Sequence, residues 1–177
     1  MLFRYGFGHA WINQGVGNEE CFLINFMNRV KDNWQQEWWG EVSNMSRLHL
    51  FCQIKHDVYL ENYLLQVSVN KYRKALSQIR CSSHRLLIET GRSTGLERSE
   101  RLCEFCDTFS IEDECHFLLE CDLYHNLRTE FLPNWAIRNT NQRTLSKLFM
   151  SKDRKTICNL ARFIYQAFQL RKEAIID

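Results

Sequence analysis

Apolar residues recur every three or four positions along most of this 177-residue chain, which is the period of an amphipathic α-helix. A long helix is predicted over about residues 19–38, with Asn18 as its N-cap. A final long helix is predicted to follow Ser151 as its cap, with Asp153 in its first turn. Shorter helices are predicted between these two, at about residues 46–54, 60–67, 70–80, 123–131 and 144–150. The pattern therefore predicts a mainly α, bundle-like chain.

Two stretches do not follow the helical period. Residues 1–17 hold four of the seven glycines and are predicted to form an irregular lead-in. The side chains expected to pack this lead-in are Phe3, Tyr5, Phe7 and Trp11. The run from Leu86 to Ile88 is expected to lead into a turn over residues 89–92. A single proline in the whole chain favours helices over proline-punctuated strands and linkers.

Targeting signals add little to this picture. The chain has no apolar run near the ~18 residues of a membrane-spanning helix. It also lacks the basic start and apolar block of a signal peptide. We therefore expect an intracellular protein, cytoplasmic or nuclear, in which clustered cysteines indicate a metal site rather than disulfides.

The cysteines point to such a site, because half of the eight fall within one short segment. The segment reads Cys103-x2-Cys106-x9-His116-x4-Cys121. Two cysteines with two residues between them can turn both sulfurs toward one ion, and an imidazole and a third thiolate complete a closed tetrahedral shell. Asp113 or Ser110 can cap a short helix that carries His116. The spacing predicts a structural Zn²⁺ bound by Cys103, Cys106, His116 and Cys121.

Alternatives to this ligand set remain open at this point. Cys115 and His125 are rival ligands, although neighbours on a helix point about 100° apart, so Cys115 and His116 rarely reach one ion. The thiols could also be packed or surface cysteines without a metal. The cysteines outside the predicted set are expected to be buried thiols: Cys21, Cys52, Cys81, Cys115 and Cys158.

The distribution of charge is more informative than the net charge of +2. Residues 1–46 carry −2, residues 47–100 carry +4, residues 101–133 carry −6 and residues 134–177 carry +6. Bound Zn²⁺ with three thiolates would add a further −1, so phosphate would be repelled from the metal segment. We therefore predict three regions: helical residues 1–100, a CCHC zinc module at 101–133, and a C-terminal helical region at 134–177.

Any nucleic-acid surface is then expected on the basic flanks of the zinc module. The candidates before the module are Lys71, Arg73, Lys74, Arg80, Arg85 and Arg92. The candidates after it are Lys147, Lys152, Arg154, Lys155, Arg162, Arg171 and Lys172. Two alternatives stay open for these cations: they could form the solvated faces of amphipathic helices, or they could pair with the acidic segment within the chain.

The chain resembles the region that follows the reverse-transcriptase domain in non-LTR (LINE-like) retrotransposon polyproteins. The strongest resemblance is the run SHRLLIETGR…RLCEFC…IEDECHFLLECDLYHNLR over residues 83–128, and its specific part is the Cys-Cys-His-Cys pattern followed by a tyrosine and a Leu-Arg pair. Looser matches are YGFGHAWINQGVGN at 5–18, RLHLFCQIK at 47–55 and LARFIYQAFQLR at 160–171. Family members often have proline after the last cysteine, where this chain has Asp122.

The resemblance implies the zinc ligands already named and a role in binding the RNA or DNA of the element during reverse transcription. The chain lacks the adjacent aspartate pair of a polymerase and the motif of a nuclease, so we expect no enzyme activity. We expect a non-catalytic, zinc-binding accessory segment, from a truncated copy or a reading frame that covers only the C-terminal piece. RNA, DNA and a reverse-transcriptase domain are its expected partners. The alternatives are a protein-interaction module built from helices and a non-functional relic.

Overall fold

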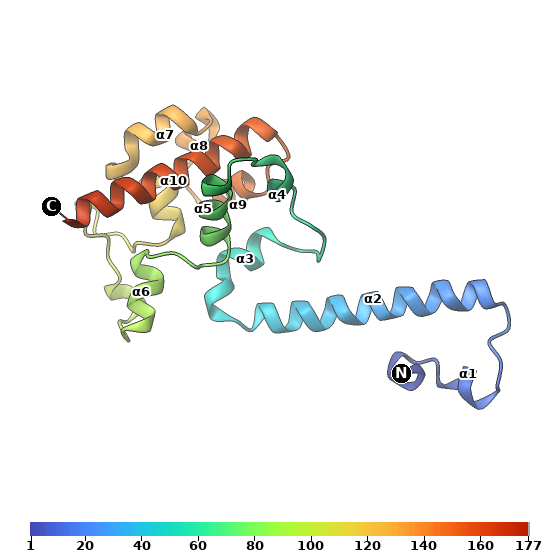
Figure 1. Ribbon diagram of the computed structural model, residues 1–177. Helices are drawn as coiled ribbons and strands as arrows, with labels where there is room; N and C mark the ends of the chain where they lie inside the picture. The colour runs from blue at the N-terminus through green and yellow to red at the C-terminus, as the bar shows by residue number, and fades with distance from the viewer. Residues whose placement is uncertain (177) are drawn as a thin grey trace. The chain divides into compact units, whose positions relative to one another are not determined.

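The computed structural model describes residues 1–176 and confirms a mainly α-helical chain (Figure 1). The α-helices are α1 (Gly8–Ile12), α2 (Glu19–Ser43), α3 (His49–Ile54), α4 (Asn62–Gln66), α5 (Asn70–Arg80), α6 (Leu87–Ser93), α7 (His125–Phe131), α8 (Asn134–Arg138), α9 (Gln142–Phe149) and α10 (Arg154–Ile176). Short 3₁₀ turns are η1 (Leu2–Tyr5), η2 (Ser46–Leu48), η3 (Arg98–Glu100) and η5 (Asp122–Tyr124), and η4 (His116–Glu120) is one turn of π-helix. Over these residues, the β-structure is limited to a bridge between Leu102 and Ile111.

The chain divides into two compact units. Unit one comprises residues 1–46 with 56–58, and unit two comprises residues 47–55 with the described chain from Tyr59 onward. The segment 101–133, predicted to be a separate zinc module, belongs to unit two. It shares that unit with parts of both helical regions that the sequence placed on either side of it.

Unit one consists mainly of the long helix α2, which begins at Glu19 and has Asn18 as its N-cap. The Asn18 side chain accepts a hydrogen bond from the Cys21 N–H at 2.8 Å, as expected of an N-cap. The lead-in packs against one end of α2 through aromatic contacts, with the Phe7 ring 5.5 Å from both Phe22 and Phe26. The prediction that Trp11 packs this lead-in is wrong, because its side chain is exposed, whereas the ring of Phe3 lies against Gly8 although much of it is exposed.

Unit two is organised around α10, which contacts α4, α5, α7 and α9 (Figure 1). Its inner face follows the predicted period, and Ile157, Leu160 and Ile164 are buried. An aromatic cluster extends this core toward the cysteine-rich segment: Phe117 stacks on Phe168 with ring centroids 4.9 Å apart and meets Tyr124 edge-on at 4.7 Å. The segment predicted to bind metal is therefore joined to the main hydrophobic core of its unit.

Two local predictions are wrong for identifiable reasons. Residues expected to form a turn after Ile88 instead form the helix α6, because the Glu112 side chain accepts a hydrogen bond from the N–H of Leu87 at 2.6 Å. This cap comes from a distant part of the chain, so the sequence around Ile88 does not predict it. At the start of α10, Asp153 and not Ser151 is the cap, since an Asp153 carboxylate oxygen accepts from the Thr156 N–H at 2.8 Å.

Candidate metal centre

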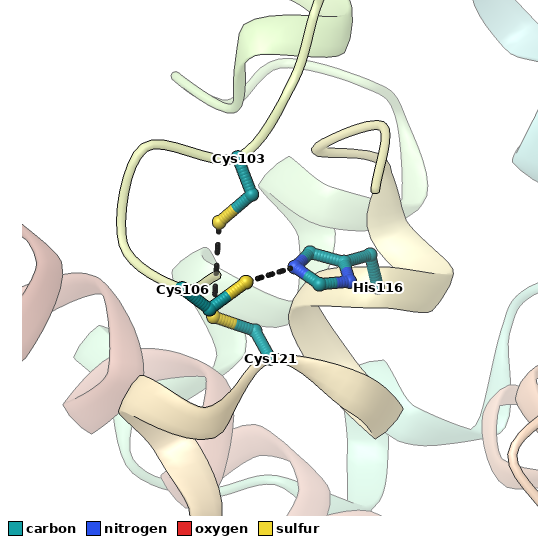
Figure 2. Close-up of side chains that lie close together, drawn as sticks. All are labelled: Cys103, Cys106, His116 and Cys121. Atoms are coloured by element: carbon teal, nitrogen blue, oxygen red, sulfur yellow. Dashed lines mark hydrogen bonds between the residues drawn. The ribbon is translucent and has the colours of Figure 1, made fainter. Parts of the chain in front are cut away.

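The first two candidate ligands lie on a tight hairpin. The Leu102–Ile111 bridge closes it, and the Cys103 N–H donates to the Ser110 carbonyl at 2.8 Å. The chain between the paired residues turns through Cys106, whose sulfur faces inward toward the same space as that of Cys103 (Figure 2). The C-x2-C spacing thus turns both sulfurs toward one space, as predicted.

The other two candidate ligands lie on and just after η4. Asp113 lies just before the helical residues that lead into this turn, and one of its carboxylate oxygens accepts from the N–H groups of Cys115 and His116, both at 3.0 Å. The backbone then takes a single π turn and ends at Cys121, whose N–H donates to the carbonyl of His116 at 2.8 Å. The wide turn brings the His116 ring and the Cys121 sulfur to the same side of the segment (Figure 2).

The four side chains converge on one point, and their ligand atoms all lie within 4.8 Å of one another. The sulfurs of Cys103 and Cys121 are 3.8 Å apart, and the Cys106 sulfur is 3.3 Å from Nε2 of His116 (Figure 2). Four ligands at tetrahedral corners around Zn²⁺ would have separations of about 3.8 Å between sulfurs and about 3.5 Å between sulfur and nitrogen. A disulfide needs about 2.05 Å between sulfurs. These residues therefore lie close enough to hold a metal ion, as predicted.

The protonation behaviour of the four groups reflects how closely they face one another. A hydrogen bond with Cys121, together with burial, raises the pKa of the Cys103 thiol to about 12, and the same bond lowers the pKa of Cys121. Burial lowers the pKa of His116, but the hydrogen bonds and charges of Cys103 and Cys106 outweigh it and raise that pKa to about 9. The donor atoms thus share protons among themselves, and a divalent cation would take the place of those protons.

A second layer of contacts holds the ligands in these positions. The Nδ1 atom of His116 lies 3.4 Å from a carboxylate oxygen of Glu120, which leaves Nε2 facing the thiols. Arg128, buried behind the site, donates to the carbonyl of Glu120 at 3.1 Å and to that of Cys121 at 2.6 Å. The arginine therefore satisfies carbonyl groups that the end of the π turn would otherwise leave without partners.

One ion pair fastens the cysteine hairpin to α10. Arg171 donates to both carboxylate oxygens of Glu112, from Nε at 3.0 Å and from Nη2 at 2.7 Å. Both residues are buried. The Arg171 guanidinium also lies over the ring of Phe105, 4.7 Å from its centroid, and Phe105 stands between the first two candidate ligands. This contact positions the hairpin on the long helix.

The rival ligands do not belong to this group of four. Cys115 is half-buried, and burial raises the pKa of its thiol to about 12. His125 is exposed at the start of α7. The expectation that the remaining cysteines are buried is wrong: Cys21 and Cys81 are exposed, and the other three are half-buried.

The predicted basic candidates separate into exposed and engaged groups. The exposed cations are Lys71, Lys74, Arg85, Lys147, Lys152, Arg154, Lys155, Arg162 and Lys172. Arg73 is half-buried and donates to the carbonyl of Val67 at 3.2 Å, and Arg92 is paired with Glu89. The exposed cations keep the capacity to bind an anion, whereas the engaged ones support the fold.

Two of the candidates are not on the surface, and their prediction is wrong. Arg80 is only 1% exposed because it turns into the core, where it pairs with Glu61 at 2.5 Å and donates to the carbonyl of Phe149 at 3.0 Å. Arg171 is buried with Glu112, as described above. In both cases a helical arginine is drawn inward by a carboxylate distant in sequence, which charge counting along one helix does not detect.

The acidic segment uses part of its charge within the chain. Beside the Glu112–Arg171 pair, Glu114 lies 3.1 Å from the buried side chain of His84, and Asp113 lies 3.5 Å from Arg98. This pairing was one of the alternatives that the sequence left open. The sequence carried no local sign of which acids would pair, since these partners are 15 to 59 residues apart.

Known proteins add no further information about this site. No model of a protein family matches the chain, and neither a curated protein nor a solved structure matches it. Across residues 1–176, no helix combines the length and the apolar character needed to cross a membrane. The interpretation of the site therefore depends on its own geometry.

Proposed function

We propose that Cys103, Cys106, His116 and Cys121 bind one structural Zn²⁺ in a non-catalytic accessory unit that associates with RNA or DNA. The observation that supports zinc is the donor set itself, three sulfurs and one imidazole nitrogen within 4.8 Å of one another. Thiolate and imidazole donors in a tetrahedral arrangement favour zinc over the hard cations, which prefer oxygen. A closed set of four protein ligands leaves no position for a substrate, so the proposed role is structural.

Bound zinc would join the hairpin to η4 and so complete the wall of the core around Phe117. The chain's own residues prepare this: Glu120 orients the His116 ring, Arg128 holds the carbonyl of Cys121, and the Glu112–Arg171 pair fixes the hairpin on α10. Structural zinc sites of this kind contribute on the order of 10 kcal/mol to local folding. Residues 101–125 would therefore depend on the ion for their order.

Zinc content and stability together test the site. Cys106→Ser should abolish stoichiometric zinc and lower the melting temperature, because three ligands hold the ion much more weakly than four. Cys115→Ser is the matched control, since Cys115 lies in the same segment but outside the group of four. Zinc measured by mass spectrometry and melting followed by circular dichroism give the two readouts. One equivalent of zinc retained by Cys106→Ser would disprove the site.

The proposed association with RNA or DNA draws support from the exposed cations of unit two and from the resemblance to the region after a reverse transcriptase. Binding of a labelled single-stranded RNA, measured at about 50 and 200 mM salt, tests it, because phosphate contacts weaken steeply with ionic strength. Binding that does not change between the two salt concentrations would argue against phosphate recognition.

A second candidate function, protein interaction, is favoured by a specific feature of unit one. Leu23, Ile24, Met27 and Trp34 on α2 are all more than half exposed. Apolar docking of a partner to this helix would be insensitive to salt, so the same titration separates the two functions.

A further inference from the structure

A basic hollow of unit two lies where the C-terminal part of α10 meets the segment before α6. It has a volume of about 510 Å³. Four cations line it, Arg47, Arg85, Arg171 and Lys172, and no aspartate or glutamate does. We call this hollow the basic groove.

The cations of the basic groove differ in how far their charge is already neutralised. Arg171 is paired with Glu112, and Arg47 lies 3.6 Å from Glu89 and donates to the carbonyl of Ser82 at 3.1 Å. Within the described chain, Arg85 and Lys172 are both exposed and have no ion pair. The groove therefore offers two uncompensated positive charges, on Arg85 and Lys172, beside two arginines that are already paired with carboxylates.

The basic groove continues into a polar stripe along α10. Arg162, Gln169 and Lys172 are exposed and spaced by seven and three residues, which places them on one face of the helix. This stripe is about 15 Å long at about 1.5 Å per residue. Tyr165 lies on the same face, and the ammonium of Lys71 from α5 sits 4.9 Å from its ring centroid. Positive charge thus lies at both ends of this stripe, on Arg162 and Lys172, and beside it on Lys71.

The rings near the basic groove do not provide a platform for bases. The side chain of His84 is fully buried, and Phe168 is stacked on the core residue Phe117. Base stacking in single-strand binding proteins needs exposed ring faces. A ligand in this groove would consequently be recognised by its negative charges and not by the identity of its bases.

We propose that the basic groove and the α10 stripe bind the phosphate backbone of a nucleic-acid strand, with Arg85 and Lys172 as the main phosphate contacts. This inference depends on the proposed association with RNA or DNA and gives it a location. An extended polyanion suits the surface better than a single phosphate, because the exposed cations Arg162 and Lys172 lie about 15 Å apart along α10, farther than one phosphate can span, whereas successive phosphates of a strand can meet both. The binding should be independent of base sequence.

The test uses the full chain loaded with zinc, and fluorescence anisotropy measures its binding to oligonucleotides. The probes are about 20 nucleotides long and consist of uridine, of adenosine or of deoxythymidine alone. The variant R85Q/K172Q removes the two free charges and should weaken binding of all three about tenfold. It should also reduce the slope of log affinity against log salt by about 1.4, since each phosphate contact on a single strand contributes about 0.7. R138Q/R143Q is the matched control, because both arginines are exposed in unit two and neither lines the groove.

Two further variants test the sign of the charge effect. R85K/K172R keeps both charges and should bind like the original chain. Glu173, exposed and next to Lys172 in sequence, should repel phosphate, so E173Q should strengthen binding about twofold. All variants alter exposed side chains, and equal zinc content and circular dichroism confirm that each one is folded.

The outcomes separate the groove from the broader proposal. If the original chain binds the oligonucleotides and R85Q/K172Q binds them no more weakly than R138Q/R143Q, the assignment of binding to the groove is wrong. The proposed association with nucleic acid would still stand. If the original chain binds none of the oligonucleotides, the association itself fails and the groove fails with it. Binding of inorganic phosphate or of vesicles containing anionic lipid, without any binding of oligonucleotides, would also overturn the assignment.

Discussion

The helices α2 and α10 are nearly equal in length, with 25 and 23 residues, and opposite in their burial. Both carry apolar residues at helical spacing, and both were expected as long helices. Along α2 only Val42 is buried, whereas α10 buries a continuous apolar face. The same type of pattern has thus produced a core helix in one unit and an exposed helix in the other.

The difference lies in what each helix packs against. Within its own unit, α2 meets the short lead-in, which covers Phe22 and Phe26 but leaves Met27 and Trp34 exposed. In unit two, α10 is contacted by four other helices. Hydrophobic periodicity predicts that a helix has an apolar face, and the rest of the chain decides whether anything covers it.

The largest expected effect compares the two apolar faces directly. Phe163 on α10 is completely buried, so we expect Phe163→Ala to lower the free energy of unfolding by about 3–5 kcal/mol through lost contacts and a cavity. Met27 on α2 is 66% exposed, and Met27→Ala should change it by no more than about 0.5 kcal/mol. Urea unfolding followed by circular dichroism measures both. Equal losses in the free energy of unfolding would mean that other residues of the folded chain bury Met27.

How much of this could be read from the sequence depends on the range of the signal. The four residues that lie close enough to hold a metal ion were predicted from the sequence, because they fall within 19 positions and their spacing is set by local geometry. The α2 cap at Asn18 was predicted for the same reason. Such signals are complete within a short window of sequence.

The contacts that fix the site to its unit could not be predicted in this way. Glu112 caps α6 and pairs with Arg171, 59 positions away, and neither interaction leaves a local trace. The buried position of Arg80 depends likewise on Glu61 and on the carbonyl of Phe149. Arginines that a charge count assigns to the surface can therefore be core residues when a distant carboxylate meets them.

A buried ion pair in unit two and an exposed one in unit one should differ in their contribution to stability in the same way. We expect Arg171→Met to destabilise unit two by about 3–5 kcal/mol, because it leaves the buried carboxylate of Glu112 without its countercharge. Arg4 and Glu37 form an exposed pair at 2.7 Å in unit one, and Arg4→Met should have no measurable effect on unfolding. Unfolding in urea measures both variants.

A double variant shows whether the loss comes from the unpaired charge. Glu112→Gln combined with Arg171→Met removes both charges and should recover part of the stability that Arg171→Met alone loses. The recovery will be incomplete, since the Glu112 side chain also accepts the N–H of Leu87 at the start of α6. A double variant no more stable than Arg171→Met alone would contradict this account.

The smallest effects come from two matching helix caps. Asn141 accepts the N–H of Thr144 at 2.9 Å at the start of α9, and Asn18 does the same for Cys21 at 2.8 Å at the start of α2. Either asparagine changed to alanine should cost its own helix about 1 kcal/mol. Because α9 buries Leu145 and Leu148 in the core, the loss at Asn141 should appear in the global unfolding of unit two.

The first turn of α2 has no buried side chain, so the loss at Asn18 should appear only as faster amide hydrogen exchange in that turn. A global loss from Asn18→Ala as large as that from Asn141→Ala would show that the start of α2 is held as firmly as the start of α9, despite its exposure.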